Sequence, residues 1–213
     1  MQKKELANIT YSYLDELFER AECELNFTNH LELLVAVMLS AQCTDKRVNQ
    51  VTQTLFKKYQ SVQDYASCNR EELEQDIFSC GFYRNKSKNI ISACQDIITK
   101  FNGQVPDNFE DLISLSGVGR KTANVVLAVG FNQDAIAVDT HVFRVSNRLG
   151  LAKAKTPFEC EKQLMNSVPK SRWSHIHHLL VLFGRYHCKA IKPNCKDCKL
   201  KPYCNYFKSS KTH

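Results

Sequence analysis

The sequence has few of the residues that make turns. Its 213 residues include only 7 glycines and 5 prolines, whereas average proteins contain about 7% glycine and about 5% proline. A fold of many short strands needs a turn at every chain reversal, so this scarcity argues against such folds and predicts a mostly helical chain. No segment has low complexity and no repeat is evident, so we expect neither a solenoid nor a flexible linker.

The sequence also lacks a long hydrophobic run. Its longest apolar stretch, residues 33–39, is far shorter than the roughly 20 residues that span a bilayer. The first ten residues, MQKKELANIT, contain no apolar signal-peptide region. We therefore expect a cytoplasmic protein, in which the ten cysteines would not form disulfides.

Charge indicates a class of partner without deciding it. The chain has 29 Lys and Arg against 22 Asp and Glu, a net charge of +7. A basic protein favours a polyanionic partner, but many ordinary soluble proteins are equally basic. Charge alone gives nucleic acid about even odds, and a length of 213 residues allows either one core or two lobes.

Helical periodicity and capping signals run through most of the chain. Apolar residues recur at helical spacing in residues 48–56 and 90–101. Asn69 with Glu72 predicts a capping box for a helix through Phe78, and Thr156-Pro157 predicts a helix start. Residues 31–41 are apolar nearly all round, which is typical of a central helix enclosed by others.

A glycine hairpin between two helices is the first candidate site. Residues 108–115 and 120–129 read as helices, joined by the tight turn Ser116-Gly117-Val118-Gly119. Glycines allow close approach of a ligand, and the following helix start presents unpaired N–H groups, so the natural ligand is a phosphate. An isolated pair of glycines would more often be a simple turn between packed helices.

Four cysteines near the C-terminus are the second candidate site. The spacing is Cys188-x6-Cys195-x2-Cys198-x5-Cys204. Four thiolates suit either zinc or a [4Fe–4S] cluster, and chemistry alone leaves the choice open. The lysines around them could be held against DNA phosphates; they are Lys189, Lys192, Lys196, Lys199 and Lys201.

The segment LSGVGRKTANVVL, followed by IAVDTHVFRV, resembles the helix–hairpin–helix and catalytic-aspartate segments of the endonuclease III family of DNA glycosylases. The resemblance implies that Lys121 is the amine nucleophile that forms a Schiff base with the sugar. It gives Asp139 the role of a base, or of a countercharge for the developing sugar cation. Without the resemblance, Lys121 would be read as a solvated lysine and Asp139 as a helix N-cap. His141 is more often structural at such a position, and we give it no catalytic role.

The cysteine spacing agrees with the cluster loop of the same family at all four positions. The resemblance therefore implies a [4Fe–4S] cofactor held by Cys188, Cys195, Cys198 and Cys204. With about two negative charges on the cluster and its thiolates, the net charge falls from +7 to about +5. We expect the cluster to position Lys189 and Lys192 on DNA and assign it no redox catalysis.

Two further segments resemble family loops that fill the gap left by a flipped base. LSAQCTD places Gln42 in that role, and GFYRNK places Phe82 where the family usually has leucine. The alternatives are that Gln42 caps the preceding helix and that Phe82 belongs to the core. Ser116 stands where the family hairpin commonly has proline, which would loosen the turn.

Together these features predict an all-α fold of two helical lobes in the compact bacterial form of the family. We expect a six-helix lobe over residues 24–132 that ends in the hairpin. The cluster lobe would consist of residues 1–23 and 133–213, with DNA bound across the cleft between the lobes. The expected protein is a monomer that binds duplex DNA containing damaged bases or abasic sites, has no membrane partner and is associated with the nucleoid.

The expected activity is that of a bifunctional glycosylase and AP lyase. It would remove oxidised pyrimidines and cleave the strand 3′ to the abasic site by β-elimination. One alternative is a related glycosylase for mismatched adenine or alkylated purine, which Lys121 and the short chain disfavour. Another is a non-catalytic DNA-binding or cluster-carrying protein, against which Lys121 and Asp139 argue. The sequence does not decide which lesions fit.

Overall fold

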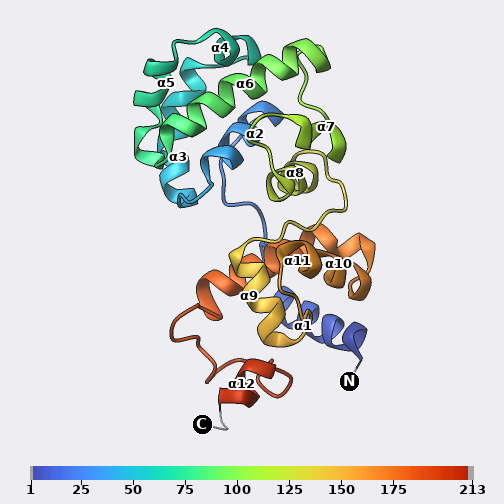
Figure 1. Ribbon diagram of the computed structural model, residues 1–213. Coiled ribbons are helices and arrows are strands. Elements are labelled where there is room, and N and C mark those ends of the chain that lie inside the picture. The colour runs from blue at the N-terminus through green and yellow to red at the C-terminus, as the bar shows by residue number, and fades with distance from the viewer. Residues whose placement is uncertain (1, 211–213) are drawn as a thin grey trace. The chain divides into compact units, whose positions relative to one another are not determined.

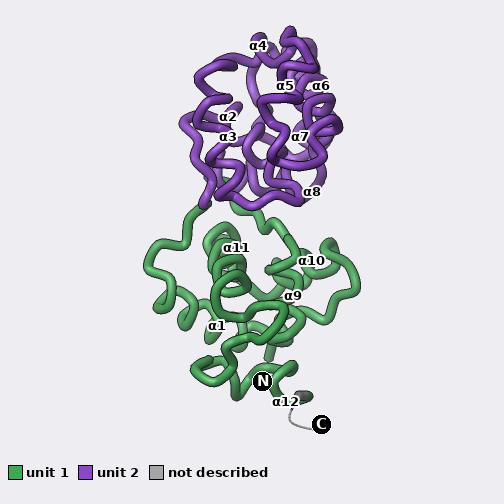
Figure 2. Tube along the Cα trace, turned by 90° about the vertical axis from the view of Figure 1, so that its left-hand side faces the viewer, with its two compact units in different colours: residues 1–23, 133–213 green, residues 24–132 purple. Residues whose placement is uncertain are grey.

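The computed structural model describes residues 2–210, and all its regular elements are helices (Figure 1). The chain divides into two compact units, Glu24–Asn132 and Met1–Cys23 with Gln133–His213 (Figure 2). The first unit is continuous in sequence, and the second is made from both ends of the chain. The all-helical prediction is confirmed. None of the described helices combines the length and the apolarity that a membrane crossing needs.

The unit of residues 24–132 is built around one enclosed helix, α2 (His30–Leu39). Eight of its ten residues are buried, which confirms the central helix predicted from its apolar surface. The surrounding helices are α3 (Asp45–Lys58), α4 (Val62–Ser67), α5 (Arg70–Asp76), α6 (Tyr83–Phe101), α7 (Phe109–Ser114) and α8 (Arg120–Val125). A short 3₁₀ turn, η1 (Phe78–Cys80), precedes α6, and a π-helical turn, η2 (Val126–Gly130), continues α8.

This unit has seven α-helical segments among its described residues, where the sequence predicts six helices. Helices α4 and α5 are separate because Cys68 is extended, with ψ of 156°, and the Asn69 side chain then caps α5. Of the two hydrogen bonds of the predicted capping box, only the one from the Glu72 N–H to the Asn69 side chain forms. The Glu72 carboxylate turns to Lys58, at 2.7 Å, and the helix ends at Asp76 instead of Phe78.

The second unit packs the N-terminal helix against helices from the other end of the chain. Helix α1 (Lys3–Leu17) contacts α10 (Pro157–Ser167) and α11 (Trp173–Leu182). The remaining elements are α9 (Thr140–Leu149), α12 (Asn205–Ser210), the 3₁₀ turn η3 (Lys170–Arg172) and the π-helical turn η4 (Phe183–His187). The predicted start of α10 is confirmed, because Thr156 and Glu159 form a capping box and Pro157 follows the cap.

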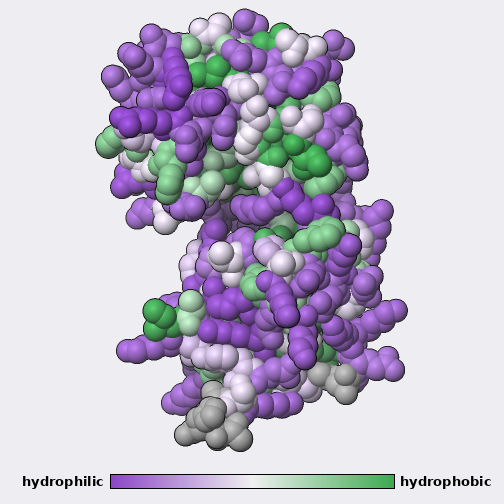
Figure 3. Space-filling view, in the orientation of Figure 1, coloured by the Kyte–Doolittle hydropathy of each residue, from purple (hydrophilic) through white to green (hydrophobic). Residues whose placement is uncertain are grey.

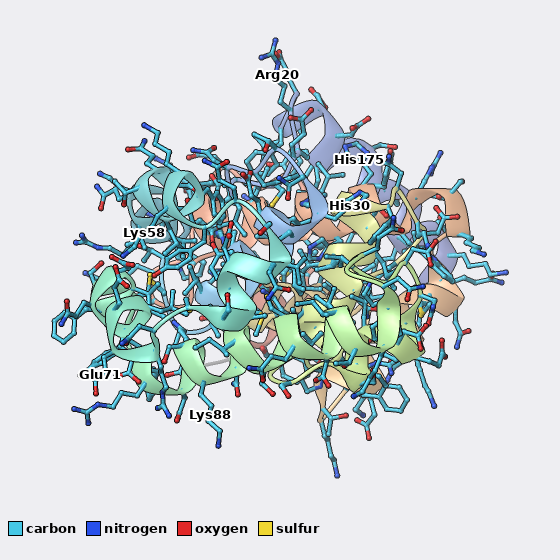
Figure 4. The ribbon with its side chains drawn as sticks, turned by 90° about the horizontal axis from the view of Figure 1, so that it is seen from above. Arg20, His30, Lys58, Glu71, Lys88 and His175 are labelled. Atoms are coloured by element: carbon cyan, nitrogen blue, oxygen red, sulfur yellow. The ribbon has the colours of Figure 1, made fainter. Side chains whose placement is uncertain are left out.

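Charged and polar side chains cover most of the face seen in Figure 3, and apolar residues on it form only small groups. The view from above shows Arg20 and Lys88 pointing away from the helices (Figure 4). Such a surface is ordinary for a globular protein in water, so the site must be located from individual residues.

Candidate nucleic-acid interface and metal centre

The hairpin between α7 and α8 has the predicted form. Gly117 has φ of +75°, and a Cβ atom there would lie 2.6 Å from the Asn89 side chain on α6. Both the backbone angle and the space therefore require glycine at this position. Gly119 is the N-cap of α8 and gives it no side-chain cap, and a helix start presents amide groups that can donate to an anion.

Ser116 anchors the hairpin, contrary to the expectation that it loosens the turn. Its Oγ lies 2.9 Å from the Oγ of Ser92 and donates to the Asp96 carboxylate at 3.4 Å. Both partners lie on α6. Val118 is buried, and its N–H donates to the Leu115 carbonyl at 3.1 Å. The turn is thus fixed at both of its non-glycine positions.

Lys121 is the second residue of α8 and is exposed to solvent. Asp139 is the N-cap of α9, where its Oδ1 accepts a hydrogen bond from the Val142 N–H at 2.8 Å. The interpretation of Asp139 as a helix N-cap is therefore correct. The cap uses one carboxylate oxygen, so the second oxygen can still take part in a reaction.

Gln42 and Phe82 both lie at tips between helices and both adopt left-handed backbone angles. Their φ values are +54° and +48°, which is unusual for residues other than glycine. Ser40, not Gln42, is the C-cap of α2. The Phe82 side chain is 62% exposed, so the alternative that it belongs to the core is wrong.

One hollow brings these two tips together with the hairpin. It has about 590 Å³ of empty space, part of it open to solvent, within the unit of residues 24–132. The lining residues are Met38, Ala41, Gln42, Phe82, Asn85, Lys86, Asn89 and Gly117. Three segments that are distant in sequence therefore share one surface, and each had been singled out from its sequence alone.

The four C-terminal cysteines line a single pocket of about 330 Å³ of empty space. Cys188 and Cys204 are buried, and Cys195 and Cys198 are half-buried. Leu149, Phe183 and Phe207 provide apolar walls. Burial raises the pKa of the Cys195 and Cys198 thiols, so stable thiolates at these positions call for a cation among them.

Among residues 2–210, no group of three His, Cys, Asp or Glu side chains is placed to hold a metal ion. What the four cysteines share is one pocket, which they line together. A single zinc ion needs all its sulfurs at about 2.3 Å from one point. A [4Fe–4S] core binds one thiolate at each of four irons, so its ligands surround a volume, and four cysteines that line one pocket are compatible with this requirement.

Two arginines that the sequence analysis missed fasten this loop to α9. Arg148 donates to the carbonyls of Lys189 and Ala190 at 2.7 and 2.9 Å, and Arg144 donates to the Cys188 carbonyl at 3.2 Å. The Nη2 atom of Arg144 also lies 3.3 Å from the Nδ1 of His141. That contact supports the structural reading of His141. Arg144 and Arg148, four residues apart and therefore on one side of the helix that follows Asp139, were the available signal.

The lysines of the loop are not equivalent. Lys189 and Lys192 are exposed, as a phosphate contact requires. Lys199 pairs with Glu16 at 2.9 Å, and Lys201 donates to the Lys196 carbonyl at 3.1 Å. Two of the five lysine amines, those of Lys199 and Lys201, therefore already have partners within the protein.

Comparison with known proteins identifies the family of this chain. Residues 35–170 match the family model described as the HhH-GPD superfamily base excision DNA repair protein. Endonuclease III of Bacillus subtilis is 55% identical over 192 residues, covering 90% of this chain and 88% of the relative. Endonuclease III of Synechocystis is 46% identical, with 95% and 93% covered.

Solved structures agree over the full fold. A trapped endonuclease III–DNA covalent intermediate superposes with a TM-score of 0.95 at 50% identity, covering 99% of this chain and 100% of that one. A non-covalent endonuclease III–DNA complex also gives 0.95, at 48% identity with 100% of both chains covered. The chain belongs to the endonuclease III family, within the HhH-GPD superfamily of base excision DNA repair proteins.

Proposed function

We propose that this protein is a bifunctional DNA glycosylase and AP lyase that removes oxidised pyrimidines from duplex DNA. The observation that carries the proposal is the position of Lys121. It follows the hairpin directly, on the unit whose hollow is lined by Gln42, Phe82 and Gly117. A relative of the same fold was trapped as a covalent intermediate on DNA, which is the behaviour expected of an amine nucleophile.

In the proposed reaction, the neutral Nζ of Lys121 attacks C1′ of the damaged nucleotide. The glycosidic bond breaks, and the base leaves with its electron pair and takes up a proton. Opening of the sugar ring then gives a Schiff base between Nζ and C1′. Loss of a proton from C2′ expels the 3′ phosphate, which cleaves the strand on the 3′ side, and water releases the lysine.

Asp139 would serve this reaction through the carboxylate oxygen that does not cap α9. Its carboxylate can accept the proton that Lys121 must lose, or stabilise the positive charge that develops on the sugar. An N-cap aspartate is held in one rotamer by its bond to Val142. The cap thus supplies the rigidity that a positioned base needs.

Binding would divide between phosphate contacts and base contacts. The amides of the Gly117-Val118-Gly119 turn would bind a DNA phosphate. Gln42 and Phe82 would enter the space left by the flipped nucleotide. Exposed Lys189 and Lys192 would add phosphate contacts from the cluster loop, in a manner that weakens with salt.

Cys188, Cys195, Cys198 and Cys204 would hold a [4Fe–4S] cluster, since their thiols converge on one pocket. When bound, the cluster supplies four metal–thiolate bonds that fix the loop, and no electron transfer is required of it. Iron and acid-labile sulfide in the purified brown protein would support this assignment. A colourless protein with one zinc ion per chain would overturn it.

The proposed substrate is chromosomal DNA, so we place the protein at the nucleoid, and we expect it to act as a monomer.

The test is borohydride trapping on duplex DNA with one abasic site or one thymine glycol. We expect wild type to give a covalent adduct and Lys121→Ala to give none. Lys88→Ala, an exposed lysine of α6, is the matched control and should trap like wild type. If folded, cluster-loaded wild type gives no adduct, the protein is a lysine-independent glycosylase or a DNA-binding protein.

A further inference from the structure

Lys86 is a buried lysine in the unit that carries the hairpin. It lies on the inner side of α6 with 6% of its surface exposed. Its Nζ donates to the Leu39 carbonyl at 2.8 Å and to the Cys80 carbonyl at 2.9 Å. Lysine is almost never fully buried without partners, so these two hydrogen bonds explain how its charge is accommodated.

The two carbonyls belong to the two segments that lead to the proposed DNA-inserting tips. Leu39 is the last residue of α2 and precedes Gln42 by three positions. Cys80 ends η1 and precedes Phe82 by two positions. One ammonium group therefore joins the end of α2 to the start of the Phe82 tip, across a long separation in sequence.

The backbone conformations of the Gln42 and Phe82 tips require contacts that hold them in place. Gln42 and Phe82 have φ of +54° and +48°, and non-glycine residues in this region persist only where surrounding contacts impose the conformation. The Leu39 carbonyl also lies at the negative end of the α2 dipole, where a cation is stabilised. The attraction between Lys86 and this helix end thus acts on the backbone next to Gln42.

Two cysteine side chains lie near the Lys86 amine. The thiols of Cys43 and Cys80 lie close to each other and close enough to interact with Lys86. Burial lowers the pKa of Lys86 and raises that of Cys80 to about 11. The two carbonyls replace water that the Lys86 amine loses on burial, and they hold the amine beneath the tips.

We propose that Lys86 is a positioning residue, which clamps the two loops so that Gln42 and Phe82 are presented to DNA as one rigid unit. The inference rests on the proposed function, since it assumes that these two side chains enter the duplex. It adds a residue that would never touch DNA. Lys86 lines the same hollow as Gln42, Phe82 and Gly117, which places the clamp directly beneath the proposed contact surface.

The test compares Lys86→Met with wild type as cluster-loaded protein. Methionine keeps the length and apolar stem of lysine but donates no hydrogen bond. The probe is duplex DNA with a tetrahydrofuran abasic analogue opposite 2-aminopurine, whose fluorescence rises when protein side chains disturb the stack. We expect Lys86→Met to reduce the fluorescence rise and to weaken binding to this duplex about tenfold. Binding to undamaged duplex should stay within twofold of wild type.

The matched control is Lys88→Met on the same helix. Lys88 is exposed and points away from the protein (Figure 4), so its loss should leave both readouts unchanged. Lys86→Arg keeps the charge and can reach both carbonyls, and it should recover a large part of the fluorescence rise. Measurements are made well below the melting temperature of each variant, so a lower stability alone does not reduce the signal.

Failure of the clamp can be separated from failure of the proposed function. Gln42→Ala and Phe82→Ala are measured on the same duplex. If they leave the fluorescence unchanged, the insertion role is wrong. If they reduce it and folded Lys86→Met does not, the clamp is wrong. Should Lys86→Met not fold, Lys86→Gln, which can reach only one carbonyl, takes its place with the same expected loss, and full insertion by that variant overturns the proposal.

Discussion

The guanidinium of Arg148 donates a hydrogen bond to the Sγ of Cys188 at 3.5 Å. The same side chain holds the carbonyls of Lys189 and Ala190 and lies over the Tyr206 ring at 4.2 Å. A single residue of α9 thus contacts Cys188, one of the proposed cluster ligands, the chain that follows it and the helix beyond the last cysteine. The cluster loop is tied to the helical core before any metal is considered.

We expect Arg148→Lys to release the cluster more readily. Lysine cannot donate to three acceptors in the planar arrangement that the guanidinium provides. Loss of charged hydrogen bonds should lower the free energy of unfolding by about 1.5–3 kcal/mol. The measurements are iron and acid-labile sulfide per chain after dialysis, together with urea unfolding. Arg20→Lys, on an exposed arginine (Figure 4), should retain wild-type iron. Equal retention by both variants would contradict the role given to Arg148.

Asp139→Asn should separate capping from catalysis. Asparagine is as good an N-cap as aspartate, so the free energy of unfolding should change by less than about 1 kcal/mol, the share due to the helix dipole. The single-turnover rate of base excision should fall by about 10² to 10⁴, the usual contribution of a general base. Asp139→Ala should lose the same rate and about 0.5–2 kcal/mol of stability. An active Asp139→Asn enzyme would restrict Asp139 to its capping role.

The two hairpin glycines should respond differently to alanine. At Gly117 a Cβ would meet Asn89 at 2.6 Å and the φ is +75°, so Gly117→Ala should lower the free energy of unfolding by about 1–3 kcal/mol. At Gly119 nothing lies within 4 Å of a built Cβ, so Gly119→Ala should fold normally. If a phosphate approaches that amide closely, Gly119→Ala should still weaken DNA binding. Thermal melting and binding to an abasic duplex give the two readouts, and a stable Gly117→Ala protein would show that the turn can rearrange.

Stability should fall in mild acid because of His178. Burial, assisted by neighbouring His175, lowers the pKa of His178 to about 4, whereas an unfolded histidine titrates near 6.5. Between these values the unfolded chain binds a proton that the folded chain does not, so stability is lost as the pH falls. From pH 7 to pH 5.5 the loss from this residue should be about 1 kcal/mol. Urea unfolding of wild type and His178→Gln across this range tests it, and parallel curves would refute the assignment.

The sequence predicted the parts of the site that depend on local spacing. The hairpin glycines, the four cysteines and the start of α10 are short patterns whose geometry follows from neighbouring residues. The roles of Lys86 and Arg148 were not predicted, because Lys86 joins Cys80 to Leu39, 47 residues before it, and Arg148 contacts Cys188, 40 residues after it. A signal existed for Lys86, which occupies the same helical stripe as Ile90, Cys94 and Ile97, all buried. A lysine on a buried stripe indicates an internal partner, but not which one.

The left-handed angles of Gln42 and Phe82 were also beyond sequence reasoning. Residues other than glycine seldom adopt them, and only contacts from other segments can impose them. The predicted capping box at Asn69 and Glu72 lacks its Glu72 half for a related reason. Glu72 has two possible partners, the helix start and Lys58, and the choice depends on how α3 packs beside α5.

The division of the chain also bears on its synthesis. Residues 24–132 are continuous, so this unit has its whole core available as soon as it has left the ribosome. Helix α1 must wait, since its buried Leu6, Tyr13 and Leu14 pack among residues from 136 to 204. At about 5–20 residues per second, that delay is on the order of ten seconds. Throughout it α1 carries an uncovered apolar face, so a helix made before residues 24–132 completes its packing after them.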